Sequence, residues 1–222
     1  MKKRKVVRRV IWGLAIAIIA IIALAVALFP NLSSVKTTGQ YAYTSLRLEL
    51  EDNSRLEGFK NDGSYRKLSV LVYYPDSNGI DKGSCPLIVF SHGGISLDTS
   101  NESLYKELAS HGYIVASVSH TYHALSTKIG GKRIFINSGY MKELNTEDSN
   151  KDVENSYACY QKWMELRTGD VSFVIDSFVQ MSDGESQPFC PLIDATRIGL
   201  AGHSLGGAAV LGVARQRTIS AP

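Results

Sequence analysis

The longest apolar run of the chain lies close to its N-terminus. Residues 10–29 carry no charged side chain, and their only polar side-chain atom is the indole nitrogen of Trp12. As an α-helix with a rise of about 1.5 Å per residue, a run of this length spans roughly 30 Å, the thickness of the hydrocarbon core of a bilayer. Pro30 is expected to end the helix. The pattern therefore predicts one transmembrane helix over residues 10–29.

Cationic residues flank this run on its N-terminal side: Lys2, Lys3, Arg4, Lys5, Arg8 and Arg9. Cationic flanks usually stay in the cytoplasm, so we expect residues 1–9 to be cytoplasmic and the soluble part to lie across the membrane. A cleaved signal peptide is the alternative, because Ala25-Val26-Ala27 resembles a cleavage site, but signal peptides have apolar regions of only about 7–15 residues. The length favours an uncleaved anchor, followed by a polar linker over residues 30–40.

Beyond residue 40, short apolar runs recur along the chain. Residues 45–50 alternate polar and apolar side chains, which is typical of a half-buried strand. Further strands are predicted over residues 68–74, 86–90, 113–118 and 197–201, which are rich in β-branched and other apolar residues. Continuous apolar runs such as residues 86–90 are typical of central parallel strands that are covered on both faces.

Segments of helical periodicity separate several of these strands. They cover residues 103–111, 205–215 and 153–178, and we expect the last helix to be bent or broken near Thr168-Gly169. Strands separated by helices predict an α/β fold with a mainly parallel sheet and helices on both faces, which we place over residues 41–222. The polar segment 120–151 is expected to be a loop or lid that shapes a pocket.

Charge and cysteine content argue against several classes of protein. The chain has 24 basic and 21 acidic residues, but six of the basic ones precede the apolar run, so the body is mildly acidic and a poor partner for nucleic acid. The three cysteines, Cys85, Cys159 and Cys190, allow at most one internal disulfide. They lack the C-x-x-C spacing of metal sites, so we interpret them as small buried apolar residues.

The clearest chemical motif is Gly202-His203-Ser204-Leu205-Gly206, which follows a predicted strand and opens a predicted helix. This is the G-x-S-x-G nucleophile elbow in its required context. The sharp turn strains the serine backbone, and glycines two positions away avoid a steric clash. Ser204 Oγ then projects at a helix N-terminus, where free N–H groups favour developing negative charge. A glycine-rich turn that only packs the helix on the strand is the alternative.

A second motif, Ser91-His92-Gly93-Gly94, follows the predicted strand at residues 86–90. In α/β-hydrolases the loop after the third strand supplies one oxyanion-hole N–H, and the residue after the nucleophile supplies the other. The candidate donors are therefore the backbone N–H groups of Gly94 and Leu205. Without side chains, Gly93 and Gly94 also let a substrate approach the backbone closely. An ordinary strand-ending turn is the alternative.

Together these segments resemble an α/β-hydrolase of the platelet-activating-factor acetylhydrolase type. The similar segments are residues 52–55, 71–75, 90–94, 108–116 and 197–207. The resemblance implies serine-dependent hydrolysis of carboxylic esters, with short acyl groups or lipid substrates, and no metal or cofactor. Two positions depart from the family pattern: Ser119-His120-Thr121-Tyr122, where the family often has acidic residues and an arginine around the histidine, and Leu205, where it often has phenylalanine.

The rest of the catalytic machinery has no expected place in the sequence. The triad order of this fold is Ser, then Asp or Glu, then His, yet residues 205–222 contain none of these acids and no histidine. Without a base the Ser204 hydroxyl is a weak nucleophile. His120 and His123 are the upstream histidines nearest to the expected cleft, and we do not expect either to substitute. We expect the chain to be the N-terminal part of a longer hydrolase and to be inactive alone.

The leading hypothesis is a single-span, extracytoplasmic serine esterase or lipase that acts on a small-molecule or lipid ester. Ser204 is its nucleophile, and the N–H groups of Gly94 and Leu205 form its oxyanion hole. The motif residues that support them are His92, Gly93, Gly202, His203 and Gly206. The alternative is a degenerate hydrolase kept as a binding domain, or a non-functional fragment. Protein partners stay open.

Overall fold

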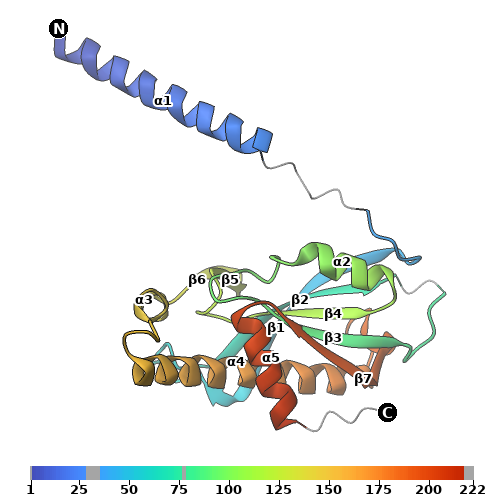
Figure 1. Cartoon of the computed structure of the whole chain (residues 1–222). Coiled ribbons are helices and arrows are strands. Elements are labelled where there is room, and N and C mark those ends of the chain that lie inside the picture. The colour runs from blue at the N-terminus through green and yellow to red at the C-terminus, as the bar shows by residue number, and fades with distance from the viewer. Residues whose placement is uncertain (1, 29–35, 77–78, 218–222) are drawn as a thin grey trace. The chain divides into compact units, whose positions relative to one another are not determined.

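The computed structural model describes residues 2–28, 36–76 and 79–217, which fall into two units, Met1–Lys36 and Thr37–Pro222 (Figure 1). The first unit contains α1 (Lys2–Leu28), a single uninterrupted helix. Its segment Arg4–Leu28 is long and apolar enough to cross a membrane, and its most apolar stretch is not buried. By length and composition it qualifies as a signal sequence or as an anchor. Residues 29–35, where the linker was expected to begin, lie outside the described residues.

A five-stranded sheet forms the centre of the second unit, in the order β1-β2-β4-β3-β7. The strands are β1 (Tyr43–Leu56), β2 (Tyr65–Pro75), β3 (Cys85–Ser91), β4 (Ile114–Ser119) and β7 (Ile193–Gly202). β2 runs antiparallel to both β1 and β4, whereas β3 runs parallel to both β4 and β7. The expected mainly parallel sheet is therefore wrong for the β1-β2 side, and the sheet is mixed. A short turn connects β1 to β2, and such a turn can only join antiparallel neighbours.

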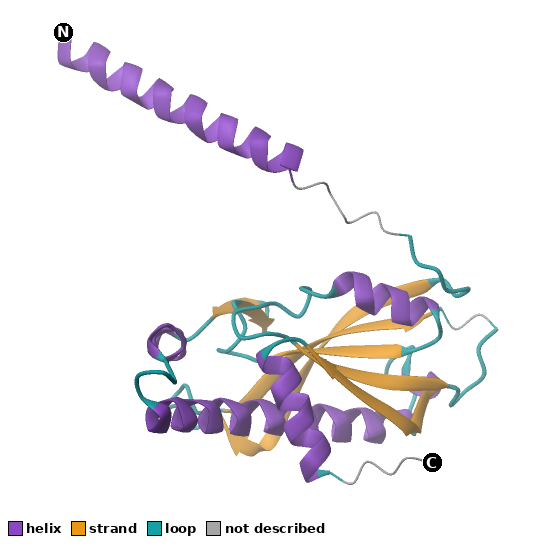
Figure 2. Ribbon diagram, viewed as in Figure 1, coloured by secondary structure: helices purple, strands orange, loops and turns teal. Residues whose placement is uncertain are grey.

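Helices cover both faces of this sheet, as predicted: α2 (Glu102–Ser110) lies on one face, and α4 (Val153–Ser182) and α5 (Leu205–Gln216) lie on the other (Figure 2). Successive side chains of a strand point to opposite faces. In β2, Leu68, Val70 and Val72 accordingly belong to the core shared with α4, whereas Leu71 and Tyr73 belong to the core shared with α2. A short 3₁₀ turn, η2 (Cys190–Leu192), leads into β7.

The expected break in the long helix at Thr168-Gly169 is wrong, because α4 is continuous through this point. Gly169 lies against the guanidinium group of Arg55, and a Cβ atom added there would collide with it. The glycine therefore makes room for a side chain of β1 and does not interrupt the helix. This contact places Arg55 beside the middle of α4.

The segment at residues 120–151 is not one long loop. It contains a β-hairpin, β5 (Ser126–Ile129) with β6 (Lys132–Phe135), and a helix, α3 (Ser138–Thr146). Gly130 and Gly131 form the hairpin turn with φ of 58° and 73°, which suits the twist of the two strands. The Asn137 side chain caps α3 by accepting hydrogen bonds from the next turn. The segment expected to be a loop or lid therefore contains regular elements.

The start of the second unit is tied to α2. Thr38 N donates to Glu107 Oε2 at 3.0 Å, and Tyr41 N donates to the Ser110 carbonyl at 3.0 Å. Gly39 N also donates to Ser110 Oγ at 3.1 Å. The linker expected to reach residue 40 is therefore too long, because residues 38–40 already belong to the folded body.

The three cysteines are free thiols in the structure. Cys85 and Cys190 are buried, as interpreted from the sequence. Cys159 lies near the start of α4 and is only partly buried, so the interpretation is wrong for this residue.

Candidate active site

Ser204 occupies a strained turn between β7 and α5. β7 ends at Gly202, α5 begins at Leu205, and Ser204 is the N-cap residue with φ 52° and ψ −124°. Among the described residues only Tyr122 and Ser204 combine a side chain with a positive φ. Such backbone conformations cost roughly 1–3 kcal/mol and persist only where the surrounding structure enforces them. The Ser204 side chain is exposed.

The glycines of the motif are required by close backbone packing. A Cβ atom on Gly202 would lie 2.5 Å from the carbonyl oxygen of Gly206. A Cβ atom on Gly206 would collide with the carbonyl groups of Ser91 and His92. Only glycine fits at both positions, which is the reason the sequence can make this sharp turn.

The two predicted motifs meet at the ends of two neighbouring parallel strands. Ser91 at the end of β3 pairs with Gly202 at the end of β7. The backbone N–H of His203 donates to the Ser91 carbonyl at 3.1 Å, and this bond continues the ladder by one residue. Because the carboxyl ends of parallel strands share one edge of the sheet, residues far apart in sequence converge there.

Gly93 and Gly94, in the loop after β3, face the turn at Ser204. A Cβ atom built on Gly93 would lie 3.6 Å from Ser204 Cβ, and one built on Gly94 would lie 3.8 Å from Leu205 Cδ2. Within the described part of the chain, neither Gly94 N–H nor Leu205 N–H donates to a protein acceptor. Two candidate donors are thus without a protein partner beside the exposed serine, the arrangement that charge stabilisation at an oxyanion requires.

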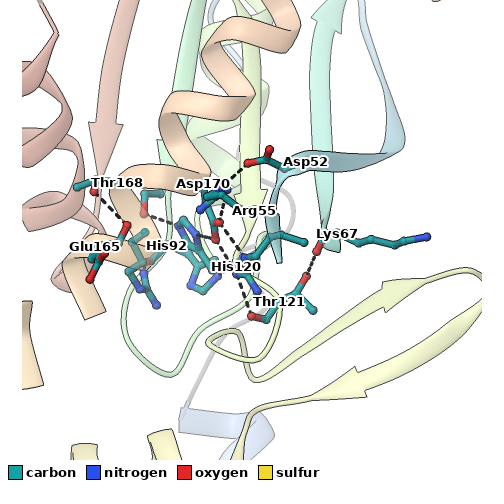
Figure 3. Close-up of polar contacts among 12 residues, drawn as sticks. Asp52, Arg55, Lys67, His92, His120, Thr121, Glu165, Thr168 and Asp170 are labelled. Carbon is teal, nitrogen blue, oxygen red and sulfur yellow. Dashed lines mark hydrogen bonds and ion pairs between the residues drawn. The ribbon is translucent and has the colours of Figure 1, made fainter. Parts of the chain in front are cut away.

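A buried polar network lies beside this loop and is centred on Asp170 of α4 (Figure 3). Asp170 accepts from Arg66 Nη2 at 2.7 Å and from Arg55 Nη2 at 3.0 Å, and its Oδ2 lies 3.0 Å from His120 Nδ1. Burial by itself would raise the pKa of Asp170, but the charge of Arg66 and the hydrogen bonds outweigh it and hold the pKa well below its usual range. Arg66 also pairs with Glu57, so the buried charges are mutually compensated.

His120 belongs to this network and not to Ser204. Its Nε2 lies 2.8 Å from Ser91 Oγ, and its Nδ1 lies next to Asp170. Burial and then the nearby Arg167 charge lower its pKa to about 4, so the imidazole is neutral at neutral pH. It therefore donates from Nδ1 to Asp170 and accepts the Ser91 hydroxyl at Nε2. Ser91, His120 and Asp170 are linked in the order of a catalytic triad, yet all three are fully buried.

The other histidines near the site have partners of their own. His123 stacks on Tyr140 at 3.7 Å between ring centroids, and burial, followed by the Arg167 charge, lowers its pKa to about 2. His92 Nδ1 donates to the Gly93 carbonyl at 2.7 Å, and burial brings the pKa of His92 well below its usual value. His203 is exposed, with its ring against Gly93. Within the described residues, no histidine hydrogen-bonds Ser204 Oγ.

Sequence reasoning missed Arg167 and Asp170, which both lie on α4 and are fully buried. Arg167 donates from Nη1 to the His92 carbonyl at 2.6 Å and from Nη2 to the Gly93 carbonyl at 3.2 Å. A signal was present: both charged residues fall on the face of the helix that Val171 and Val174 direct into the core. Charged residues on an apolar helix face are seldom buried unless they are paired.

Known proteins support an esterase of this fold. The chain is 29% identical over 147 residues to a platelet-activating factor acetylhydrolase of Canis lupus familiaris, covering 57% of this chain and 31% of the relative. It is 27% identical to a probable 1-alkyl-2-acetylglycerophosphocholine esterase of Arthroderma benhamiae, covering 63% of this chain and 30% of the relative. The chain thus spans about a third of the length of these curated relatives.

A solved structure and a family model agree with these relatives. A ferulic acid esterase from Streptomyces cinnamoneus superposes with a TM-score of 0.63 at 26% identity, covering 83% of this chain and 58% of the esterase. The family model described as platelet-activating factor acetylhydrolase, isoform II, matches residues 75–220, more than half of the chain. The chain therefore belongs to this family of α/β-hydrolase serine esterases.

Proposed function

We propose that the protein hydrolyses carboxylic esters with Ser204 as its nucleophile and with the N–H groups of Gly94 and Leu205 as its oxyanion hole. One observation carries the proposal: an exposed serine is held at φ 52° between a strand and a helix, beside two N–H groups that have no protein acceptor among the described residues. Ester hydrolysis as such agrees with the named activities of the relatives.

The reaction proceeds in two halves in this proposal. Ser204 Oγ attacks the ester carbonyl while its proton passes to a general base, and the carbonyl electrons move onto an oxyanion held by Gly94 and Leu205. Collapse breaks the ester C–O bond, and the alcohol leaves with that proton. Water then attacks the acyl-enzyme and releases the acid. No base is hydrogen-bonded to Ser204 among the described residues, so in this reaction the histidine and its carboxylate come from outside them.

For the substrate we propose an ester with a short acyl group, carried on a lipid or on a small alcohol. One relative is named for the acetyl ester of platelet-activating factor, and another for a 1-alkyl-2-acetylglycerophosphocholine. A membrane location fits a lipid substrate. In this proposal α1 stays uncleaved, spans the membrane with its cations in the cytoplasm, and keeps the hydrolase unit on the other side.

A fluorophosphonate probe tests the assignment, because it forms a covalent bond only with an activated serine. We expect the native protein, in membranes of its source, to be labelled, and the labelled peptide to contain Ser204 and not Ser91. Ser204→Ala should abolish labelling, whereas Ser182→Ala, at a half-buried serine of α4 whose hydroxyl donates to the Val179 carbonyl, should label like the wild type. An unlabelled native protein overturns the proposal.

A non-catalytic role is the second candidate. It is favoured because, among the described residues, no base is hydrogen-bonded to Ser204 Oγ. A degenerate hydrolase would keep the serine turn and the loop at residues 92–94 but lack the base. The 222-residue chain expressed alone tests whether its own residues can activate Ser204. We expect it to fold but not to be labelled. Labelling of this chain would show that its own residues already activate Ser204.

A further inference from the structure

Arg167 is a buried cation whose hydrogen-bond partners are backbone carbonyls of the loop at residues 92–94. Its side chain is fully buried, and it donates to the carbonyls of His92 at 2.6 Å and Gly93 at 3.2 Å. The other buried arginine near the site, Arg66, instead pairs with Glu57 and Asp170. Among the described residues no carboxylate forms a salt bridge with Arg167. A buried charge is costly, so a side chain kept here needs a reason beyond filling space.

The Gly93 carbonyl, one of the two that Arg167 binds, belongs to the same peptide group as the N–H of Gly94. In a planar trans peptide the C=O and N–H bonds point in opposite directions. The Gly93 carbonyl accepts from Arg167 Nη2 and also from His92 Nδ1 at 2.7 Å, so it is fixed toward the protein interior. The Gly94 N–H is thereby fixed in the opposite direction, away from Arg167.

Neighbouring peptide groups of the loop are held as well. The Arg167 fork also binds the His92 carbonyl, and the Tyr140 hydroxyl of α3 donates to the Gly94 carbonyl at 3.3 Å. Three successive carbonyls thus have donors from α3, α4 and the loop itself. The planar guanidinium binds two of them at once, which a lysine ammonium cannot reproduce in the same geometry.

We propose that Arg167 is a positioning residue that orients the Gly94 N–H for the oxyanion hole through the carbonyls of His92 and Gly93. The inference rests on the proposed function, because it assigns Arg167 a task only if Gly94 stabilises an oxyanion at Ser204. Its positive charge behind the loop also favours negative charge on the substrate side.

The test compares three variants of the native protein. Arg167→Met keeps the length of the side chain but removes both donors, and Arg167→Lys keeps the charge without the fork. Val174→Ala on the same helix is the matched control, because it lowers stability through the core without touching the loop. The readouts are the rate of Ser204 labelling by a fluorophosphonate and the kcat and KM for 4-nitrophenyl acetate.

We expect Arg167→Met to lower the labelling rate and kcat by about 10²-fold, the effect of losing one oxyanion donor, with little change in KM. Arg167→Lys should recover part of this loss, and Val174→Ala should retain wild-type kcat well below its melting temperature. A merely structural role would lower the fraction of folded enzyme and leave the kcat of the folded fraction unchanged. Wild-type kcat in either folded Arg167 variant would overturn the inference and leave the proposed function intact.

Hydrogen exchange of the segment at residues 89–95 gives a second readout that does not need activity. Loss of the guanidinium should speed exchange in this segment, whereas a segment at residues 171–182 should exchange as in the wild type. If the wild type is not labelled, the proposed function fails. Unchanged exchange in Arg167→Met or Arg167→Lys would overturn the positioning role as well.

Discussion

The buried histidines His92, His120 and His123 are held neutral by their surroundings. Burial is the largest cause in each case, and it lowers the pKa of all three side chains below their usual value of 6.5. In the unfolded chain these imidazoles take up protons near pH 6.5, but in the folded chain they do so only at much lower pH. Their contribution to stability is therefore complete above pH 6.5 and is lost as the pH falls, to about 4 for His120 and further for His123.

We predict that the free energy of unfolding, measured with urea in detergent, falls steeply between pH 6.5 and 4.5. His123→Phe should reduce this slope by about one proton, or about 1.4 kcal/mol per pH unit, because phenylalanine can still stack on Tyr140 and does not titrate. Phe59→Leu is the control, since it loosens the packing around His123 without removing a titratable group. An unchanged slope in His123→Phe would mean that this ring is protonated in the folded protein.

Asp170 compensates the charges of Arg66 and Arg55 in the interior. We predict that Asp170→Asn lowers the free energy of unfolding by about 3–5 kcal/mol, because it leaves buried cations without their counter-charge. Asp176→Asn is the matched control on the same helix: its carboxylate is 64% exposed and its partner Arg217 is 31% exposed, so the change should cost under about 1 kcal/mol. Equal losses in urea unfolding would contradict the assigned role of Asp170.

How far single residues can be predicted depends on how local their signal is. Ser204, Gly202 and Gly206 stand out in the sequence because the turn that needs them is made by adjacent residues. Asp170 and Arg167 gave no such signal, since their partners lie in β2, β1 and the loop after β3. A charged side chain on the apolar face of a helix was the available clue, and only the folded chain identifies its partners.

At the level of elements, Gly169 has a role that can be measured by a double-mutant cycle. Replacing glycine by alanine inside a helix normally stabilises it by about 1 kcal/mol. We predict that Gly169→Ala instead destabilises the protein by roughly 1–3 kcal/mol, because its Cβ collides with the Arg55 guanidinium, which ion pairs with Asp52 and Asp170 hold in place. In an Arg55→Ala background the same change should become stabilising. Additive effects of the two substitutions on urea unfolding would exclude the collision.

The elements themselves were predicted well where an apolar run or a helical period was long. The predicted break in α4 was wrong because a glycine within a helical pattern looks the same whether it ends a turn or accommodates Arg55 from a distant strand. The hairpin of β5 and β6 was missed because its strands are short and polar, although Gly130-Gly131 marked the turn. Contacts made far along the chain decide such cases.

For the molecule as a whole, α1 leads to a prediction about the membrane. We expect the protein to remain in the membrane pellet after carbonate extraction. Ile18→Lys combined with Ile19→Lys should release it or prevent insertion, because each lysine at the helix centre costs about 2.5–3.5 kcal/mol. Ile18→Leu combined with Ile19→Leu is the apolar control. A mature N-terminus just after Ala27 would show instead that the segment is a cleaved signal peptide.

The α/β fold and the family were predictable for the whole molecule, because they rest on the strand–motif–helix order at the elbow and on the alternation of strands and helices. The mixed sheet was not predicted, since strand direction depends on which strands become neighbours. The eight residues between β1 and β2 are too few for a parallel crossover, but the strands predicted at residues 45–50 and 68–74 left 17 residues between them and did not exclude one.

The Ser91–His120–Asp170 array has a consequence for how catalytic centres are recognised. By distance alone it satisfies the usual template of serine, imidazole and carboxylate. Ser91 is nevertheless sealed in the interior, while the serine that solvent reaches is Ser204 on its strained turn. Backbone conformation and access, more than the proximity of matching functional groups, distinguish a reactive serine from an inert one.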